Sequence, residues 1–277
     1  MGLRIATNVA SISAQRVLNN TSQQQARHYT RIASGNRIAT AADDAAGLSI
    51  AENLRGQIRS MRQAERNAND GISFVQVAEG GMSEISNILI RLRELSIQAA
   101  SDTIGDRERG FIDQEFQSLT KEVDRIANVT NFNGTPLLNA QAEKSSLEFQ
   151  VGTRSDEADR ITFDTTEADV RASSLGIEGL STASIEDARG GLNSIDEALA
   201  RVNGARARMG AMQNKLQATV NNLGVTRENL AQARSRVTDT ELAEETSELV
   251  RENILQTAGV SILAQANNAP TQALKLV

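Results

Sequence analysis

The chain has 277 residues, and its composition excludes the thick, aromatic-rich core found in most globular proteins. Apolar residues make up 39% of the chain and aromatic residues 3%, whereas soluble domains are roughly 45–50% apolar. The absence of Cys excludes thiolate chemistry, and a single His argues against His-based catalysis and metal binding. The net charge of −6 argues against bulk binding to nucleic acid.

The first 42 residues form a basic, amphipathic segment. They contain five Arg and no Asp or Glu, and Ile5, Val9 and Ile12 form an apolar helical stripe. The segment lacks the apolar run of a secretory signal peptide. A mitochondrial presequence would share its charge, but the amphipathic pattern continues far beyond presequence length. His28 has no second His nearby, which favours a surface or packing role.

A long helix is predicted from about Asp43 to Ala100. Apolar residues recur in two heptad rows, at Leu54, Met61, Ala68, Val75, Met82 and Leu89, and at Ala78, Ile85, Leu92 and Ala99. Internal glycines each disfavour a helix by about 1 kcal/mol relative to Ala, but on a seam they permit close packing, so we expect one uninterrupted helix. Asp43 and Asp44 precede it and are expected to cap it. Without partner carboxylates, this pair does not favour a glycosidase or metal site.

A third helix and a β-hairpin are predicted in the middle of the chain. The helix spans Asp106 to Val129, with one apolar stripe at Ile112, Phe116, Leu119, Val123 and Ile126. It ends at a turn-forming cluster in residues 131–136. Apolar and polar residues then alternate around Leu147–Val151 and again at Ile161 and Phe163, which predicts two strands with residues 152–160 as their loop.

The last part of the chain is predicted to be helical from near Ser184. Large residues at heptad spacing are followed three positions later by mostly small ones: Ile195, Val202, Met209, Leu216, Leu223, Leu230 and Val237, then Ala198, Ala205, Met212, Thr219, Thr226 and Ala233. Residues 236–277 carry three basic and six acidic residues, a net charge of −3, and an apolar stripe at Val250, Ile254, Ala258 and Ile262. Opposite charge and similar length predict that this segment pairs with residues 1–42. Because two thin helices bury little surface, we expect both to be disordered in the monomer and to pair only in a polymer.

These patterns predict a mainly α fold, an elongated antiparallel helical bundle or coiled coil with a small β-hairpin region near residues 140–180. The expected domains are residues 1–42 paired with 236–277, and residues 43–235. The longest charge-free stretch, residues 253–274, is too polar to insert into a membrane. Gly80-Gly81 lacks the lysine and context of a phosphate-binding loop. We therefore expect a structural or assembly protein that is not an enzyme and uses no cofactor.

Several long motifs resemble those of the bacterial flagellins. They lie at residues 31–50, 67–73, 91–98, 131–134 and 252–267, and the first reads RIASGNRIATAADDAAGLSI. The resemblance is specific because these motifs are long and occur in the family's order over roughly residues 1–140 and 180–277. Only about 45 residues separate Leu138 from Ser184. The resemblance therefore implies a short flagellin with only the inner core domains, without the variable outer domains of most family members.

The resemblance implies a structural subunit that polymerises into the flagellar filament for swimming motility, with the paired termini lining the filament's inner tube. The implied partners are further copies of the chain as a helical homopolymer, an export chaperone at residues 250–276, and filament cap and hook-junction proteins. The implied location is extracellular, after export without a cleaved signal peptide. A hook–filament junction protein, which shares the terminal helices, and a non-flagellar signalling coiled coil remain as alternatives.

Two sets of site residues are predicted. Contacts between subunits are expected at Arg31, Arg37, Asp43, Asp44, Arg55, Leu249, Ile254 and Ile262. Arg91, Leu95 and Gln98 are spaced to share one helix face, for which a subunit contact is the simplest explanation. The resemblance also implies that this face contacts the vertebrate innate receptor for flagellin, with Glu115 on the next helix completing the site. Ile90 stands where responsive family members usually have glutamine.

Overall fold

The computed structural model describes residues 7–141 and 146–274, which divide into two compact units. Of the described residues, the terminal unit contains 7–58 and 228–274, and the central unit contains 59–141 and 146–227. Within the described ranges, none of the helices combines the length and the hydropathy that a membrane crossing requires.

Long helices dominate both units. The described residues contain α1 (Val9–Ser34), α2 (Ala45–Ala99), α3 (Asp106–Val129), α4 (Ala172–Leu175), α5 (Ile185–Thr238) and α6 (Leu242–Leu274). The predicted helix from Asp43 to Ala100 is α2, which continues through its internal glycines, and α3 has the predicted bounds. The heptad helix predicted from near Ser184 is α5. Together with two small antiparallel strand pairs, these helices confirm the predicted mainly α fold class.

Local side-chain and backbone contacts fix where the helices of the terminal unit begin and end. The first helix stops at Gly35, which takes a left-handed φ of 71° and donates its N–H to the Arg31 carbonyl at 2.8 Å. Asp44 accepts the Gly47 N–H at 2.8 Å, so it caps α2 as predicted. At the end of α5, Arg37 donates its backbone N–H to the Thr238 carbonyl at 2.7 Å. The 35–44 segment is therefore held at both of its ends.

Large apolar side chains from α2, α3 and α5 form the core of the central unit. Members of the predicted heptad rows are buried there: Val75, Met82, Leu89, Leu92, Ile195, Val202, Met209 and Leu216. Phe74 packs edge-on against three other rings, with centroid distances of 5.0 Å to Phe163, 5.4 Å to Phe149 and 5.8 Å to Phe132. Most of the few aromatic residues are thus concentrated in one cluster.

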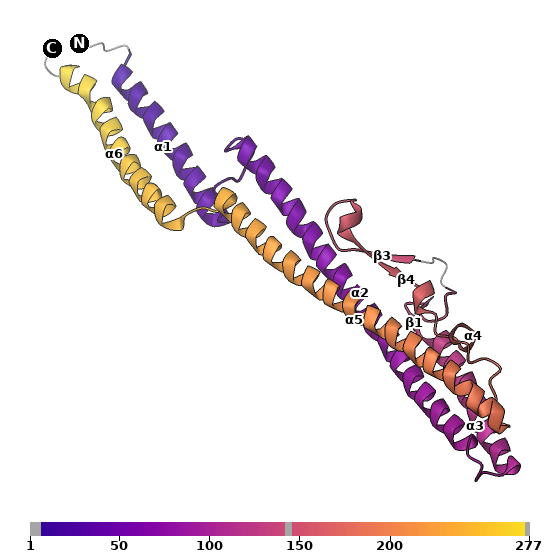
Figure 1. Cartoon of the computed structure of the whole chain (residues 1–277). Coiled ribbons are helices and arrows are strands. Elements are labelled where there is room, and N and C mark those ends of the chain that lie inside the picture. The colour runs from indigo at the N-terminus through magenta and orange to yellow at the C-terminus, as the bar shows by residue number, and fades with distance from the viewer. Residues whose placement is uncertain (1–6, 142–145, 275–277) are drawn as a thin grey trace. The chain divides into compact units, whose positions relative to one another are not determined.

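Two hairpins supply rings to this core. The predicted hairpin is confirmed as β3 (Ser146–Gln150) and β4 (Arg160–Asp164), which are labelled in Figure 1. Their antiparallel register places Leu147 opposite Phe163. A second, shorter pair joins β1 (Asn131–Phe132) to β2 (Thr135–Pro136). The sequence analysis identified this region as a turn but not as a strand pair. Its Asn133-Gly134 dipeptide takes φ of 50° and 81°, as tight hairpin turns require.

A buried arginine holds the connection between α2 and α3. Arg109 is buried, and its guanidinium donates to the Ala99 carbonyl at 2.9 Å and the Ser101 carbonyl at 3.1 Å. Its third partner is Asp106, at 2.8 Å. Carbonyls at a helix C-terminus lack intrahelical donors. Arg109 therefore supplies the donors that the end of α2 lacks.

In the terminal unit, α1 and α6 lie side by side, the indigo and yellow helices of Figure 1. Both helices are formed and in contact within one chain. The expectation that they are disordered in the free monomer and pair only in a polymer stays a prediction. Hydrogen bonds join them, from Asn8 Nδ2 to the Ala266 carbonyl at 2.8 Å and from Ser11 Oγ to Asn267 Oδ1 at 2.6 Å. Polar contacts therefore add to the limited apolar burial between the two helices.

Candidate subunit interface

The seam between α1 and α6 is built mainly from small and polar residues at heptad spacing, with three leucines among them. Its partly or fully buried positions are Ser11, Ala14, Leu18, Thr21, Gln25 and His28 on α1, and Glu245, Leu249, Glu252, Gln256, Gly259, Leu263 and Ala266 on α6. A Cβ placed on Gly259 would lie 3.2 Å from Leu18 Cδ1, so the two helices approach closely there. Gln25 and Asn253 add a side-chain hydrogen bond across the seam. This seam therefore buries little of the apolar surface that the two helices carry.

Most of the large apolar side chains of both helices point away from the seam, although Leu18, Leu249 and Leu263 are half-buried in it. Nine aliphatic side chains are at least 49% exposed: Val9, Ile12, Val17, Leu242, Val250, Ile254, Leu255, Val260 and Ile262. The apolar stripes of the two terminal segments therefore lie on the outer faces of these helices and not in the seam, apart from Ile5, which lies outside the described residues. Close helix approach favours small residues in the seam, and this leaves the β-branched residues on the outer faces.

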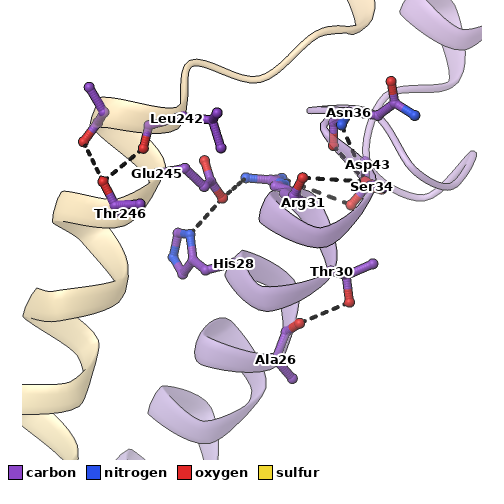
Figure 2. Close-up of polar contacts among 11 residues, drawn as sticks. Ala26, His28, Thr30, Arg31, Ser34, Asn36, Asp43, Leu242, Glu245 and Thr246 are labelled. Carbon is purple, nitrogen blue, oxygen red and sulfur yellow. Dashed lines mark hydrogen bonds and ion pairs between the residues drawn. The ribbon is translucent and has the colours of Figure 1, made fainter.

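A buried carboxylate joins the C-terminal end of α1 to the start of α6. Glu245 is 8% exposed, and its Oε1 lies 2.7 Å from His28 Nδ1 and 3.6 Å from an Arg31 guanidinium nitrogen (Figure 2). Arg31 also reaches Asp43 at 3.9 Å. The single His thus has a packing role in the seam, and the predicted residues Arg31 and Asp43 are brought together.

The turn before α2 is ordered by Asp43. Its Oδ2 accepts the Thr40 N–H at 2.8 Å and the Thr40 hydroxyl at 2.9 Å. These hydrogen bonds, first from the backbone and then from the side chain of Thr40, hold the pKa of the Asp43 carboxyl below its ordinary value. The side chain of Arg37 donates to the Val237 carbonyl at 2.8 Å, and Arg55 pairs with Glu52 at 2.6 Å. All of these predicted interface residues make contacts within one chain.

Comparison with known proteins identifies the family. Residues 5–143 match the model of the bacterial flagellin N-terminal helical region, and residues 192–277 match that of the C-terminal helical region. A flagellar filament core protein of Brachyspira hyodysenteriae is 37% identical over 99% of both chains, and a flagellin of Halalkalibacterium halodurans is 38% identical over 98% of both. The chain belongs to the bacterial flagellin family. It is a structural subunit of the flagellar filament, as predicted from the sequence.

Solved structures agree with this assignment. The crystal structure of Bacillus cereus flagellin is similar with a TM-score of 0.51 and 31% identity, covering 57% of this chain and 88% of that one. A putative flagellar hook-associated protein of Vibrio parahaemolyticus gives a TM-score of 0.59 over 71% of this chain, at 16% identity. That second likeness shows a shared fold only. The hook–filament alternative therefore has no support beyond the fold, and family membership excludes the signalling coiled coil.

The apolar interface residues predicted for this flagellin differ in accessibility. Ile254 and Ile262 stand on the outer face of α6, open to a partner. Leu249 is half-buried in the α1–α6 seam. The sequence analysis also missed Val17, Leu255 and Val260, which share the outward exposure. All three lie out of phase with the seam positions, but the sequence carries no signal for this, because it does not show which heptad row forms the seam.

The predicted receptor-contact stripe is not one exposed face. Leu95 is only 1% exposed and belongs to the core of the central unit, whereas Arg91 and Gln98 are exposed. Arg91 pairs with Glu115 at 2.9 Å and with Glu94 at 3.0 Å, and these hydrogen bonds, chiefly that of Glu115, raise the pKa of Arg91. The structure therefore brings Arg91 and Glu115 together, as expected, but leaves Leu95 no accessible surface.

Proposed function

We propose that the terminal unit is the surface through which this flagellin polymerises, and that it lines the inner tube of the filament. The observation that carries the proposal is the set of nine large aliphatic side chains on α1 and α6 that are at least 49% exposed. Burying one Val, Leu or Ile side chain contributes about 1.5–3 kcal/mol relative to leaving it exposed. Contact with neighbouring copies would remove these side chains from water, which supports the pairing of the chain's two ends as an assembly domain.

A matched pair of Val→Asp substitutions tests this proposal. Val250→Asp places a carboxylate on the proposed contact surface, and Val225→Asp makes the same change at a similarly exposed position of the central unit. Burying a carboxylate without a partner is costly, so Val250→Asp should raise the critical concentration for seeded filament growth roughly tenfold or more. Val225→Asp should change it little. Equal effects of the two substitutions, measured by sedimentation, would contradict the proposal.

We also propose that the charged turn contributes to contacts between stacked subunits through Arg37, Asp43, Asp44 and Arg55. Arg37, Asp43 and Arg55 are exposed, and Asp44 is half-buried. A single exposed ion pair contributes only about 0–1 kcal/mol to the stability of a contact. Repetition along a polymer multiplies such small terms. The double variant Arg37→Glu with Arg55→Glu should alter filament stability or waveform while the monomer's helix content is unchanged, and unaltered filaments would argue against it.

The exposed apolar side chains of α6 would allow premature contact between copies inside the cell. We propose that an export chaperone covers α6 inside the cell, and that the subunit then reaches the extracellular filament through the flagellar export apparatus, without a cleaved signal peptide. There it would join further copies between the hook-junction and cap proteins. A chain lacking residues 250–277 should lose the chaperone in co-purification from export-blocked cells. Undiminished co-purification would place the chaperone elsewhere on the chain.

We further propose that the dissociated monomer binds the vertebrate innate receptor for flagellin through Arg91, Gln98 and Glu115, with Leu95 supporting this surface from the core. Burial of this surface in the filament would prevent the receptor from reaching it, so only the monomer should bind. Losing a desolvated Arg contact at an interface hot spot costs on the order of 2 kcal/mol, or roughly a 30-fold rise in Kd. A titration of wild-type and Arg91→Ala monomers against the receptor ectodomain measures this, and equal binding would remove the site.

A further inference from the structure

The terminal unit contains a pocket between the C-terminal end of α1 and the turn that precedes α2. Its volume is about 330 Å³, at the lower end of the range for small-molecule sites and so suited to one side chain. The lining residues are Ala26, Arg27, Thr30, Arg31, Ala39, Thr40, Ala42 and Asp43. Five of these eight are Ala or Thr, which present methyl groups. The pocket is therefore largely apolar but carries three charged side chains.

Only one of the three charged groups is free within the described part of the chain. Arg31 and Asp43 face each other, and Arg31 also faces Glu245. Arg27 is exposed and has no hydrogen bond or ion pair with any described residue. The pocket thus offers apolar walls beside an unpaired cation, which is complementary to an apolar side chain that stands next to a carboxylate.

The chain carries such a pair at the start of α6. Leu242 is 56% exposed, and the side chain of Glu241, the residue before it, is exposed and without a partner among the described residues. The other large exposed residues of α1 and α6 are not adjacent to a free carboxylate. Ile254, for example, follows Asn253 and precedes Leu255, and Val250 precedes Arg251. Leu242 does not line the pocket of its own chain.

We propose that Leu242 of one copy inserts into this pocket of a second copy, while its Glu241 pairs with the second copy's Arg27. The inference rests on the proposed function of the terminal unit and names one contact within it. We call Leu242 with Glu241 the knob. The knob and the pocket are different surfaces of the same chain, so the contact is heterologous. Each copy inserts its knob into one neighbour and receives the knob of another neighbour in its pocket. Heterologous contacts that do not close into a ring produce open, helical polymers.

The apolar half of the contact is tested with two substitutions at one position. Leu242→Ala removes the buried volume, so it should raise the critical concentration for seeded growth of the full chain roughly tenfold or more. Leu242→Met keeps the volume and apolar character and should stay near the wild-type value. Equal critical concentrations for Leu242→Ala and the wild type would overturn the proposal.

The charged half is tested by exchanging the charges between two subunits. Arg27→Glu and Glu241→Arg should each assemble poorly, because every contact would then join like charges. A 1:1 mixture of the two variants should regain assembly, since a contact between the two kinds of subunit restores opposite charges, and the double variant should regain it alone. Glu228→Arg, at an exposed position of α5 in the same unit and outside both the pocket and the start of α6, makes the same charge change away from the contact and should assemble normally.

The outcomes separate this contact from the wider proposal. If wild-type chains fail to elongate from seeds, the terminal unit's role in polymerisation fails. If wild-type chains elongate but the mixture of Arg27→Glu and Glu241→Arg does not recover, only the knob-and-pocket contact fails. If Glu228→Arg is as impaired as Glu241→Arg, the loss reflects overall charge and the contact is likewise overturned. Circular dichroism of each monomer checks that the exposed substitutions leave the helices intact.

Discussion

In the central unit, heptad rows of α2 and α5 bury Leu, Ile, Val and Met, whereas in the terminal unit the heptad seam buries Thr, Glu and small residues. The two units also treat their large apolar side chains in opposite ways. Phe74 and Phe163 are buried by their own chain, and the half-buried Phe132 and Phe149 pack against Phe74. Ile254 and Val260 are left in solvent.

This difference shows that heptad spacing alone does not make a helix pair self-sufficient. Apolar burial is the dominant favourable term in folding, and the central unit obtains it internally. The helices of the terminal unit are held together chiefly by close packing and by hydrogen bonds. Each hydrogen bond contributes a net stabilisation of only about 1 kcal/mol. We therefore expect the central unit to carry most of the stability of the isolated chain, and the terminal unit to open readily.

The sharpest test of this contrast is a cavity in the central core. Phe163→Ala removes a fully buried ring and should lower the free energy of unfolding by about 3–5 kcal/mol. Phe111→Ala makes the same change at a side chain that is largely exposed, where the effect should stay within about 0.5 kcal/mol. Urea unfolding followed by circular dichroism measures both. Similar losses for the two variants would show that the central core does not dominate stability.

A smaller effect is expected from the carboxylate in the terminal seam. Glu245→Gln removes the charge that faces His28 and Arg31, and hydrogen bonds to charged groups contribute about 1.5–3 kcal/mol. Amide hydrogen exchange in α1 and α6 should accelerate accordingly, while exchange in the central unit stays unchanged. Glu244→Gln, an exposed neighbour without a partner among the described residues, is the matched control. Slowed or unaltered exchange in both helices would mean that the seam does not depend on this carboxylate.

The smallest effect concerns pH and the turn before α2. Because the pKa of Asp43 is lowered in the folded chain, this residue stabilises the turn above its ordinary pKa of 3.8. That contribution is lost as the pH falls below 3.8 and through the still lower folded value. Proteolysis of the 36–44 segment by pepsin should therefore accelerate in this acid range. Asp43→Asn should show little of this dependence, and an equally steep acid response in the variant would assign the effect to another group.

Local patterns in the sequence predicted most of the elements. The bounds of α3 were predicted because its apolar stripe starts after a turn and ends at the Asn131–Pro136 cluster, signals that lie within a few residues of each boundary. The alternation around Phe149 and Phe163 likewise predicted β3 and β4. The motifs at residues 31–50 and 252–267 indicated the flagellin family without any knowledge of the fold.

Only the tertiary structure decided which face of each helix is covered. In α6, an apolar stripe through Ile254 and a polar heptad row through Glu245 are both compatible with helical periodicity, and close approach to α1 at Gly259 selects the polar row. In α2, Leu95 shares a face with Arg91 by spacing alone, yet it is enclosed in the central core. The sequence determines the period and the residues on each face of a helix, because these follow from backbone geometry. Which face is buried depends on how close another helix comes, and that distance is set by contacts between residues far apart in the chain.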